Sequence, residues 1–399
     1  MITLSRVRPL FEFGLGLCVF VFLPLLALFP RAAAGLEAVA GVLALAVASP
    51  AGLVAWRRVT RPALLLAVLV VWGLASTLWA IQPARALLID ARLLGLFAAG
   101  LALVAAVPEV AVPARLLAWF CAGLALALAL TVAQYRTLGA LTGPFSKQMF
   151  VEPRLNQVEA GLVTLIAPLA ASLALRRRVW AAALVAAATL AVVLLLVGDT
   201  AQVGLAVGMA VALPAYFWRR LTARVAAAVS VAIILTAPLI FPALIGIDAL
   251  ARWARATKFS MWHRLEIWSF VGAHIAQRPL LGWGLDSSRA IPGGSELTPE
   301  GVPWLPLHPH NGPLQVWLEL GAPGAALFAL LVARLWLLVA AAPWTRLYVA
   351  ACAASLVAAF TVTLASYGLW QEWWIGSEFL VLFLVLTMGR LASQAHPMP

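Results

Sequence analysis

Apolar residues fall in long blocks along this chain, and short stretches between the blocks hold most of the charges. A run of about 17–25 apolar residues is long enough to cross a bilayer as a helix. The pattern therefore predicts an all-α polytopic membrane protein with about twelve spanning helices, at residues 10–30, 33–55, 63–80, 91–107, 114–134, 158–175, 179–197, 200–218, 225–246, 313–338, 346–366 and 373–389.

The composition agrees with this prediction. The 399 residues are 64% hydrophobic and 11% charged, whereas a soluble domain has about 25% charged residues. The first apolar run lacks a clear cleavage site, so we expect it to be retained as the first helix. Cys18, Cys121 and Cys352 lie in separate apolar runs without metal or redox spacing, so we expect them to pack between helices.

The net charge of +12 comes from short basic clusters between the apolar runs, which indicates membrane topology rather than nucleic-acid binding. Fifteen arginines fall on one predicted side, among them Arg57, Arg176 and Arg390, against six basic residues in the short loops of the other side. The positive-inside rule then places both termini in the cytoplasm. Residues 1–246 hold helices one to nine, residues 247–312 form a periplasmic loop, and residues 313–399 hold helices ten to twelve and the cytoplasmic C-terminus.

The predicted loop at 247–312 is long enough to suggest a function of its own. In its first part, residues 249–277, aromatic and apolar residues alternate with basic ones, which is typical of a helix lying at the headgroup level. Its second part is rich in turn residues, from ProGlyGlySer at 292–295 to ProTrpLeuPro at 303–306, and is predicted to be irregular.

The segment that begins the tenth helix carries the main candidate for chemistry. Asn311 suits the N-cap and Pro313 the first turn, which places His310 just outside a helix N-terminus. A histidine at the membrane surface can transfer a proton at neutral pH, although a lone interfacial histidine is more often without chemistry. We take His310 as the candidate catalytic residue and Asn311 as a supporting one.

Further along the same helix lies the group Gly321-Ala-Pro-Gly324. Gly321 and Gly324 permit close approach of a neighbouring helix. Pro323 removes the hydrogen bond to the carbonyl of Glu319 and predicts a kink. Glu319 lies roughly 13 Å along the helix from His310, and an acidic residue at this depth faces a cavity or a partner, such as an arginine. We name it as a supporting residue only.

Two outer arginines, Arg154 and Arg264, are candidates for binding a pyrophosphate, because guanidinium groups bind phosphate oxygens and stay charged. The alternatives are a headgroup contact or a salt bridge, for example between Arg264 and Glu266. There is no DxD, HExxH or paired-cysteine motif, and no nucleotide-binding glycine loop. We therefore expect no metal and no cofactor, with the energy supplied by an activated lipid-linked substrate.

His310-Asn311, nine residues and Gly321-Ala-Pro-Gly324 together resemble the H-[N/S/Q]-x9-G-x-x-[G/T/Y] signature of bacterial O-antigen ligases. That family also has about twelve helices, cytoplasmic termini and a long periplasmic loop before the signature. Residues 278–284, ArgProLeuLeuGlyTrpGly, are similar to a stretch of the wider ligase and polymerase superfamily. So are Arg264 with Trp268, and Arg154 with Asn156 and Gln157. One departure is GlyAspThrAlaGln at 198–202, which lacks the arginine of a Ser-Arg pair and leaves a third cationic contact unassigned.

The resemblance implies a GT-C-like enzyme of the bacterial inner membrane. Such an enzyme transfers a glycan from undecaprenyl pyrophosphate to a lipid A-core sugar at the periplasmic face, without metal or nucleotide. It also implies His310 as the catalytic residue, Arg154 and Arg264 at the pyrophosphate, and Gln157 in support. Three alternatives stay open: an O-antigen polymerase, a protein O-oligosaccharyltransferase and, from another class, a lipid-linked glycan transporter.

Overall fold

The computed structural model describes residues 4–57, 59–142, 152–196 and 198–395. Within these residues the chain is helical and contains no β-strand, apart from one isolated bridge between Leu297 and Pro303. The long helices are α1 (Leu4–Leu28), α2 (Ala33–Ala48), α4 (Thr60–Ser76), α5 (Pro83–Ala106), α6 (Pro113–Arg136), α7 (Glu152–Leu175), α8 (Val179–Leu195), α9 (Asp199–Phe217), α10 (Arg219–Ala243), α13 (Gly312–Ala341), α14 (Arg346–Ala365) and α15 (Glu372–Ala395).

These elements confirm the polytopic all-α prediction. Ten helices in the described residues are long and apolar enough to cross a membrane. The remaining two, α4 and α8, are apolar but shorter, with 17 residues each. Each of the twelve apolar runs therefore corresponds to one long helix, and the run at 33–55 also reaches the short helix α3 (Leu53–Arg57).

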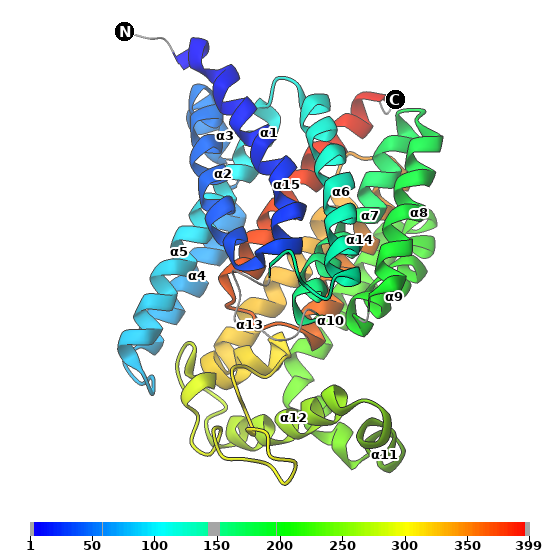
Figure 1. Cartoon of the computed structure of the whole chain (residues 1–399). Coiled ribbons are helices and arrows are strands. Elements are labelled where there is room, and N and C mark those ends of the chain that lie inside the picture. Colours follow the sequence, from blue (N-terminus) through cyan, green and yellow to red (C-terminus); the bar gives the residue numbers. More distant parts are fainter. Residues whose placement is uncertain (1–3, 58, 143–151, 197, 396–399) are drawn as a thin grey trace.

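The spanning helices form one bundle, which Figure 1 shows from the side. Helix α1 packs between α2 and α6, α9 packs along α14, and α10 packs along α13. The spans of α7 and α15 are among the most buried and that of α10 is the least. Helix α1 begins and α15 ends at the same end of the bundle (Figure 1), as an even number of spans requires.

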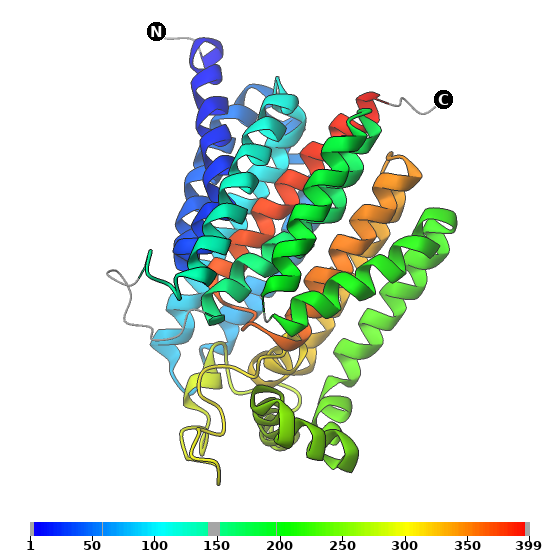
Figure 2. The same cartoon turned by 45° about the vertical axis from the view of Figure 1, so that its right-hand side comes forward.

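The segment 247–312 lies at the opposite end, below the bundle in both views (Figure 1 and Figure 2). It contains α11 (Asp248–Thr257), α12 (Phe259–Gln277) and the short 3₁₀ turn η6 (Ser287–Ala290), followed by irregular chain. The division into a helical first part and an irregular second part is thus confirmed. Helix α12 packs on α10 and α13 and buries Leu265, Trp268 and Val271. That this part of the segment lies at the headgroup level stays a prediction.

Helix α13 breaks at Gly321, where φ is 63° and ψ is −162°. Residues 279–284 fill the break: the backbone N–H groups of Trp283 and Gly284 donate to the carbonyls of Leu318 and Glu319, at 2.9 and 2.8 Å. A Cβ on Gly321 would clash with the Leu280 carbonyl. The predicted kink is confirmed.

The prediction that Gly321 and Gly324 admit a neighbouring helix is wrong. Gly321 faces the 279–284 loop, and a Cβ on Gly324 would meet Leu320 and Val316 of its own helix. The two stretches that resemble the ligase superfamily, 278–284 and 321–324, therefore dock onto each other. This docking orients the first half of α13, which begins at the candidate site.

Candidate functional site

His310 lies in the connection before α13 and is partly buried. Its Nδ1 lies 2.6 Å from the carbonyl oxygen of Ser366, at the end of α14. A carbonyl can only accept a hydrogen bond, so Nδ1 carries the proton in the neutral ring. Within the described chain Nε2 has no hydrogen-bond partner, so it is the nitrogen that offers a lone pair.

The surroundings of His310 favour the neutral ring. Burial, and next the positive charge of Arg264, lower the pKa of His310 to about 4, against an ordinary value of about 6.5. The contact with the Ser366 carbonyl acts in the other direction but is smaller. At neutral pH the side chain is therefore unprotonated with a fixed tautomer, and its Nε2 lone pair is available to accept a proton.

The neighbours of His310 hold the chain in place. Asn311 is fully buried and its Oδ1 accepts a hydrogen bond from the backbone N–H of Leu314 at 2.9 Å, so the predicted N-cap is confirmed. The carbonyl of Pro309 accepts a hydrogen bond from Nε1 of Trp268 at 2.9 Å. Trp268 thereby ties α12 to the start of α13.

Arg264 lies on α12, close enough to His310 for its charge to lower the histidine pKa. In the described part of the chain no carboxylate lies within ion-pair distance of its guanidinium, and its buried Nε has no hydrogen-bond partner. The alternative of a salt bridge with Glu266 is wrong, because residues two apart on a helix do not face each other. A partly buried, unpaired guanidinium can bind an anion.

The other predicted anion contact is less defined. Arg154 lies in the first turn of α7, but its side chain is outside the described residues. Gln157 lies one turn later and is partly buried, and no described residue forms a hydrogen bond with it.

Glu319 is fully buried, and it is bound by neutral donors rather than by an arginine. Its carboxylate accepts hydrogen bonds from the backbone N–H of Asp286 at 2.6 Å, from Nε1 of Trp370 at 2.6 Å, from Nε2 of Gln315 at 3.1 Å, and from Ser288. The alternative of an arginine partner is therefore wrong. Glu319 joins α13, η6 and the connection between α14 and α15, which is a structural role.

Sequence reasoning missed three cationic side chains that form ion pairs around the site. Arg85 and Arg289 both pair with Asp286, at 2.5 and 3.5 Å. At residues 198–202, where the sequence lacks an arginine, Lys258 reaches Asp199 with Nζ–O distances of 2.9 and 3.1 Å. Arg85 and Lys258 lie 201 and 59 residues from their partners, so no local spacing could have indicated these two pairs. Arg289 lies only three residues from Asp286.

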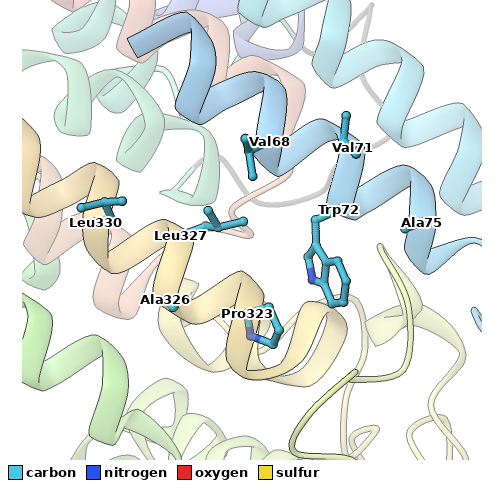
Figure 3. Close-up of a pocket in the computed structure, with 8 residues that line it drawn as sticks. All are labelled: Val68, Val71, Trp72, Ala75, Pro323, Ala326, Leu327 and Leu330. Carbon is cyan, nitrogen blue, oxygen red and sulfur yellow. The ribbon is translucent and has the colours of Figure 1, made fainter. Parts of the chain in front are cut away.

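An apolar groove of about 490 Å³ runs between α4 and α13 (Figure 3). Val71 and Trp72 line it from α4, and Pro323 and Leu327 line it from α13, just beyond the kink. Nε1 of Trp72 donates to the carbonyl of Leu320 at 2.9 Å, which ties α4 to the kink. A groove with apolar walls can hold a hydrocarbon chain.

Among the described residues no group of three or more His, Cys, Asp or Glu side chains is placed to hold a metal ion. The chemical groups of the site are a neutral imidazole, a nearby guanidinium without an ion-pair partner, and donors from the backbone. These groups can accept a proton and stabilise an anion.

Residues 181–329, which include α12, His310 and the kink of α13, match the family model described as O-antigen ligase. A provisionally named polysaccharide ligase of Rickettsia conorii is 39% identical over 159 residues, which cover 38% of this chain and 38% of that relative. Provisional polysaccharide ligases of Rickettsia prowazekii and Rickettsia felis are 36% and 40% identical over 159 and 134 residues. These two matches cover 38% and 33% of this chain and 39% and 33% of the relatives. The likeness thus spans less than two fifths of each relative.

Proposed function

We propose that this chain, whose residues 181–329 match the family model described as O-antigen ligase, is a membrane glycosyltransferase. It transfers a glycan from undecaprenyl pyrophosphate to a hydroxyl group of the lipid A-core oligosaccharide, in lipopolysaccharide biosynthesis. The reaction takes place at the periplasmic face of the bacterial inner membrane. The observation that carries the proposal is the neutral His310, with Nε2 unoccupied by any described residue, beside the unpaired guanidinium of Arg264.

In the proposed reaction the acceptor hydroxyl attacks the anomeric carbon of the donor glycan. His310 Nε2 takes the hydroxyl proton as the new C–O bond forms. The bond from the anomeric carbon to the pyrophosphate breaks, and its electron pair leaves with the pyrophosphate oxygen. A single displacement of this kind inverts the anomeric configuration.

The leaving pyrophosphate gains negative charge at the membrane surface, where Arg264 stabilises it, together with Arg154. The same anion offsets the positive charge that forms on His310 once it has taken the proton. Binding of the pyrophosphate and proton transfer are thereby coupled. Without the anion, the charge of Arg264 destabilises the protonated ring of His310, and with the anion bound this repulsion is offset.

The prenyl chain of the donor also needs a binding site. The groove between α4 and α13 is apolar and lies beside the kink of the helix that His310 precedes. We assign the prenyl chain of the carrier to this groove. The segment 247–312, which supplies Arg264, is assigned to cover the site and to bind the acceptor oligosaccharide.

The test is reconstitution of the purified protein with the undecaprenyl-pyrophosphate-linked glycan and lipid A-core, with EDTA and without nucleotide. A shift of the lipid A-core band on a gel is expected. Lengthening of the glycan on its carrier would instead identify a polymerase, and transfer to an added serine- or threonine-containing peptide would identify a protein O-oligosaccharyltransferase. Movement of the intact donor across a vesicle membrane, without transfer, would identify a transporter.

A further inference from the structure

A second histidine, His308, is buried and contacts His310 directly. The centroids of the two rings are 4.3 Å apart. Nδ1 of His308 lies 3.2 Å from the backbone nitrogen of His310 and accepts its hydrogen bond. The arrangement is that of an Asx turn, in which a side-chain acceptor binds the backbone N–H two residues on, with an imidazole nitrogen replacing the amide oxygen.

His310 needs such support because of its backbone. Its φ is 53°, in the left-handed region that residues other than glycine rarely adopt. A residue stays in this region only where its surroundings impose it. The carbonyl of Ser366 holds the His310 ring, and His308 holds the His310 backbone N–H.

The connection between α14 and α15 holds His308 in turn. A Cβ on Gly368 would lie 2.9 Å from Cγ of His308, so the absence of a side chain there makes room for the ring. Nε2 of Gln371 lies 3.1 Å from Nε2 of His308. The indole N–H of Trp373 donates to Oε1 of Gln371 at 3.0 Å and fixes the position of the Gln371 side chain against the histidine ring.

The protonation of His308 follows from its environment. Burial, and next the contact with His310, lower its pKa strongly, so the ring is neutral. A neutral imidazole has one unprotonated nitrogen, so with Nδ1 accepting the N–H of His310 the proton of His308 lies on Nε2, and Nε2 of Gln371 contacts the ring without a hydrogen bond. Its neutral state also keeps a second positive charge away from His310.

We propose that His308 is a positioning residue, which holds the backbone of His310 in the left-handed conformation and thereby aims its imidazole at the acceptor hydroxyl. The proposal rests on the proposed function in so far as it concerns proton transfer. A misplacement of about 1 Å at a reacting group can reduce a rate by about 100-fold. A change at His308 therefore acts on the chemical step and not on substrate binding.

Two substitutions separate positioning from space filling. His308→Phe keeps a ring of similar size and removes the acceptor, whereas His308→Asn keeps an acceptor for the N–H of His310 and removes the ring. We expect His308→Phe to lower kcat by about 10–100-fold with KM for donor and acceptor unchanged within about twofold. His308→Asn should retain kcat within about fivefold of the wild type. The opposite order, with His308→Phe active and His308→Asn impaired, would overturn the proposal.

A structural readout tests the same inference without any activity. Cryo-electron microscopy of the wild type and of His308→Phe in nanodiscs should show that His310 leaves the left-handed region and loses its contact with Ser366 in the variant. An unchanged His310 would overturn the proposal. If the wild type transfers no glycan, the proposed function fails, and this comparison still decides the role of His308.

Discussion

Acidification from pH 7.5 to 5.5 should leave most of the glycan transfer intact, because His310 stays neutral over this range. With its pKa lowered to about 4, the unprotonated fraction at pH 5.5 is about 0.97. A histidine with the ordinary pKa of about 6.5 would be only about 0.09 unprotonated at the same pH. The structure therefore predicts about tenfold more activity at pH 5.5 than an unperturbed histidine would allow.

The direction follows from the causes of the shift. Burial is the largest cause and the charge of Arg264 the second, and both disfavour the protonated ring. Activity is therefore lost only as the pH falls through about 4. Arg264→Met removes the second cause, so its acid limb should move to higher pH, toward 6.5, whatever its overall rate.

The assay is kcat/KM for the lipid-linked donor between pH 4.5 and 8, which reports ionisation in the free enzyme. Glu266 needs a control, because burial and the neighbouring Glu300 raise its pKa to about 7. The Glu266→Gln variant removes that ionisation. If the wild type and Glu266→Gln both lose half of their activity near pH 6.5, the reasoning about His310 is refuted.

Three further predictions concern the anion contact, the kink and the groove. Arg264→Ala should lower kcat by about 100-fold or more, as loss of a charge-stabilising donor does, and Arg264→Lys should restore only part of it; equal rates for all three proteins would contradict the assignment. Gly321→Ala should lower the thermal unfolding temperature in detergent. The positive φ at Gly321 costs a residue with a side chain about 1–2 kcal/mol, even before any clash is counted. Gly95→Ala is the control, because the space around Gly95 is open, and it should leave the unfolding temperature unchanged. Val71→Trp should fill the groove and raise KM for a long-chain donor but not for a ten-carbon prenyl donor. Leu74→Trp, elsewhere on the exposed surface of α4, should change neither KM value. An equal rise in KM for both donors would argue against the groove as the site of the prenyl chain.

Local rules predicted the features that depend on neighbouring residues. The apolar runs predicted the twelve long helices. Asn311 and Pro313 predicted the start of α13, and Pro323 predicted the region of its kink. The exact break at Gly321 depends on residues 279–284, which supply the hydrogen bonds that the helix loses there.

The features that escaped prediction depend on contacts between distant segments. Gln371 is 63 residues from His308, and Trp370 is 51 residues from Glu319. The sequence shows two histidines on either side of a proline, at positions 308 and 310. The fold makes one of them the support of the other. Similarly, an acidic residue in a spanning helix suggested an arginine partner, but the fold brings an indole, an amide, a hydroxyl and a backbone N–H to Glu319.

The central claim is that the neutral imidazole of His310 takes the proton of the acceptor hydroxyl. The most direct test is single-turnover transfer from donor to lipid A-core by the wild type and by His310→Ala, with binding of the labelled donor measured on both proteins. The account predicts that His310→Ala binds the donor normally and transfers glycan at least about 100-fold more slowly, as loss of a general base requires. Transfer at the wild-type rate by His310→Ala would contradict the account.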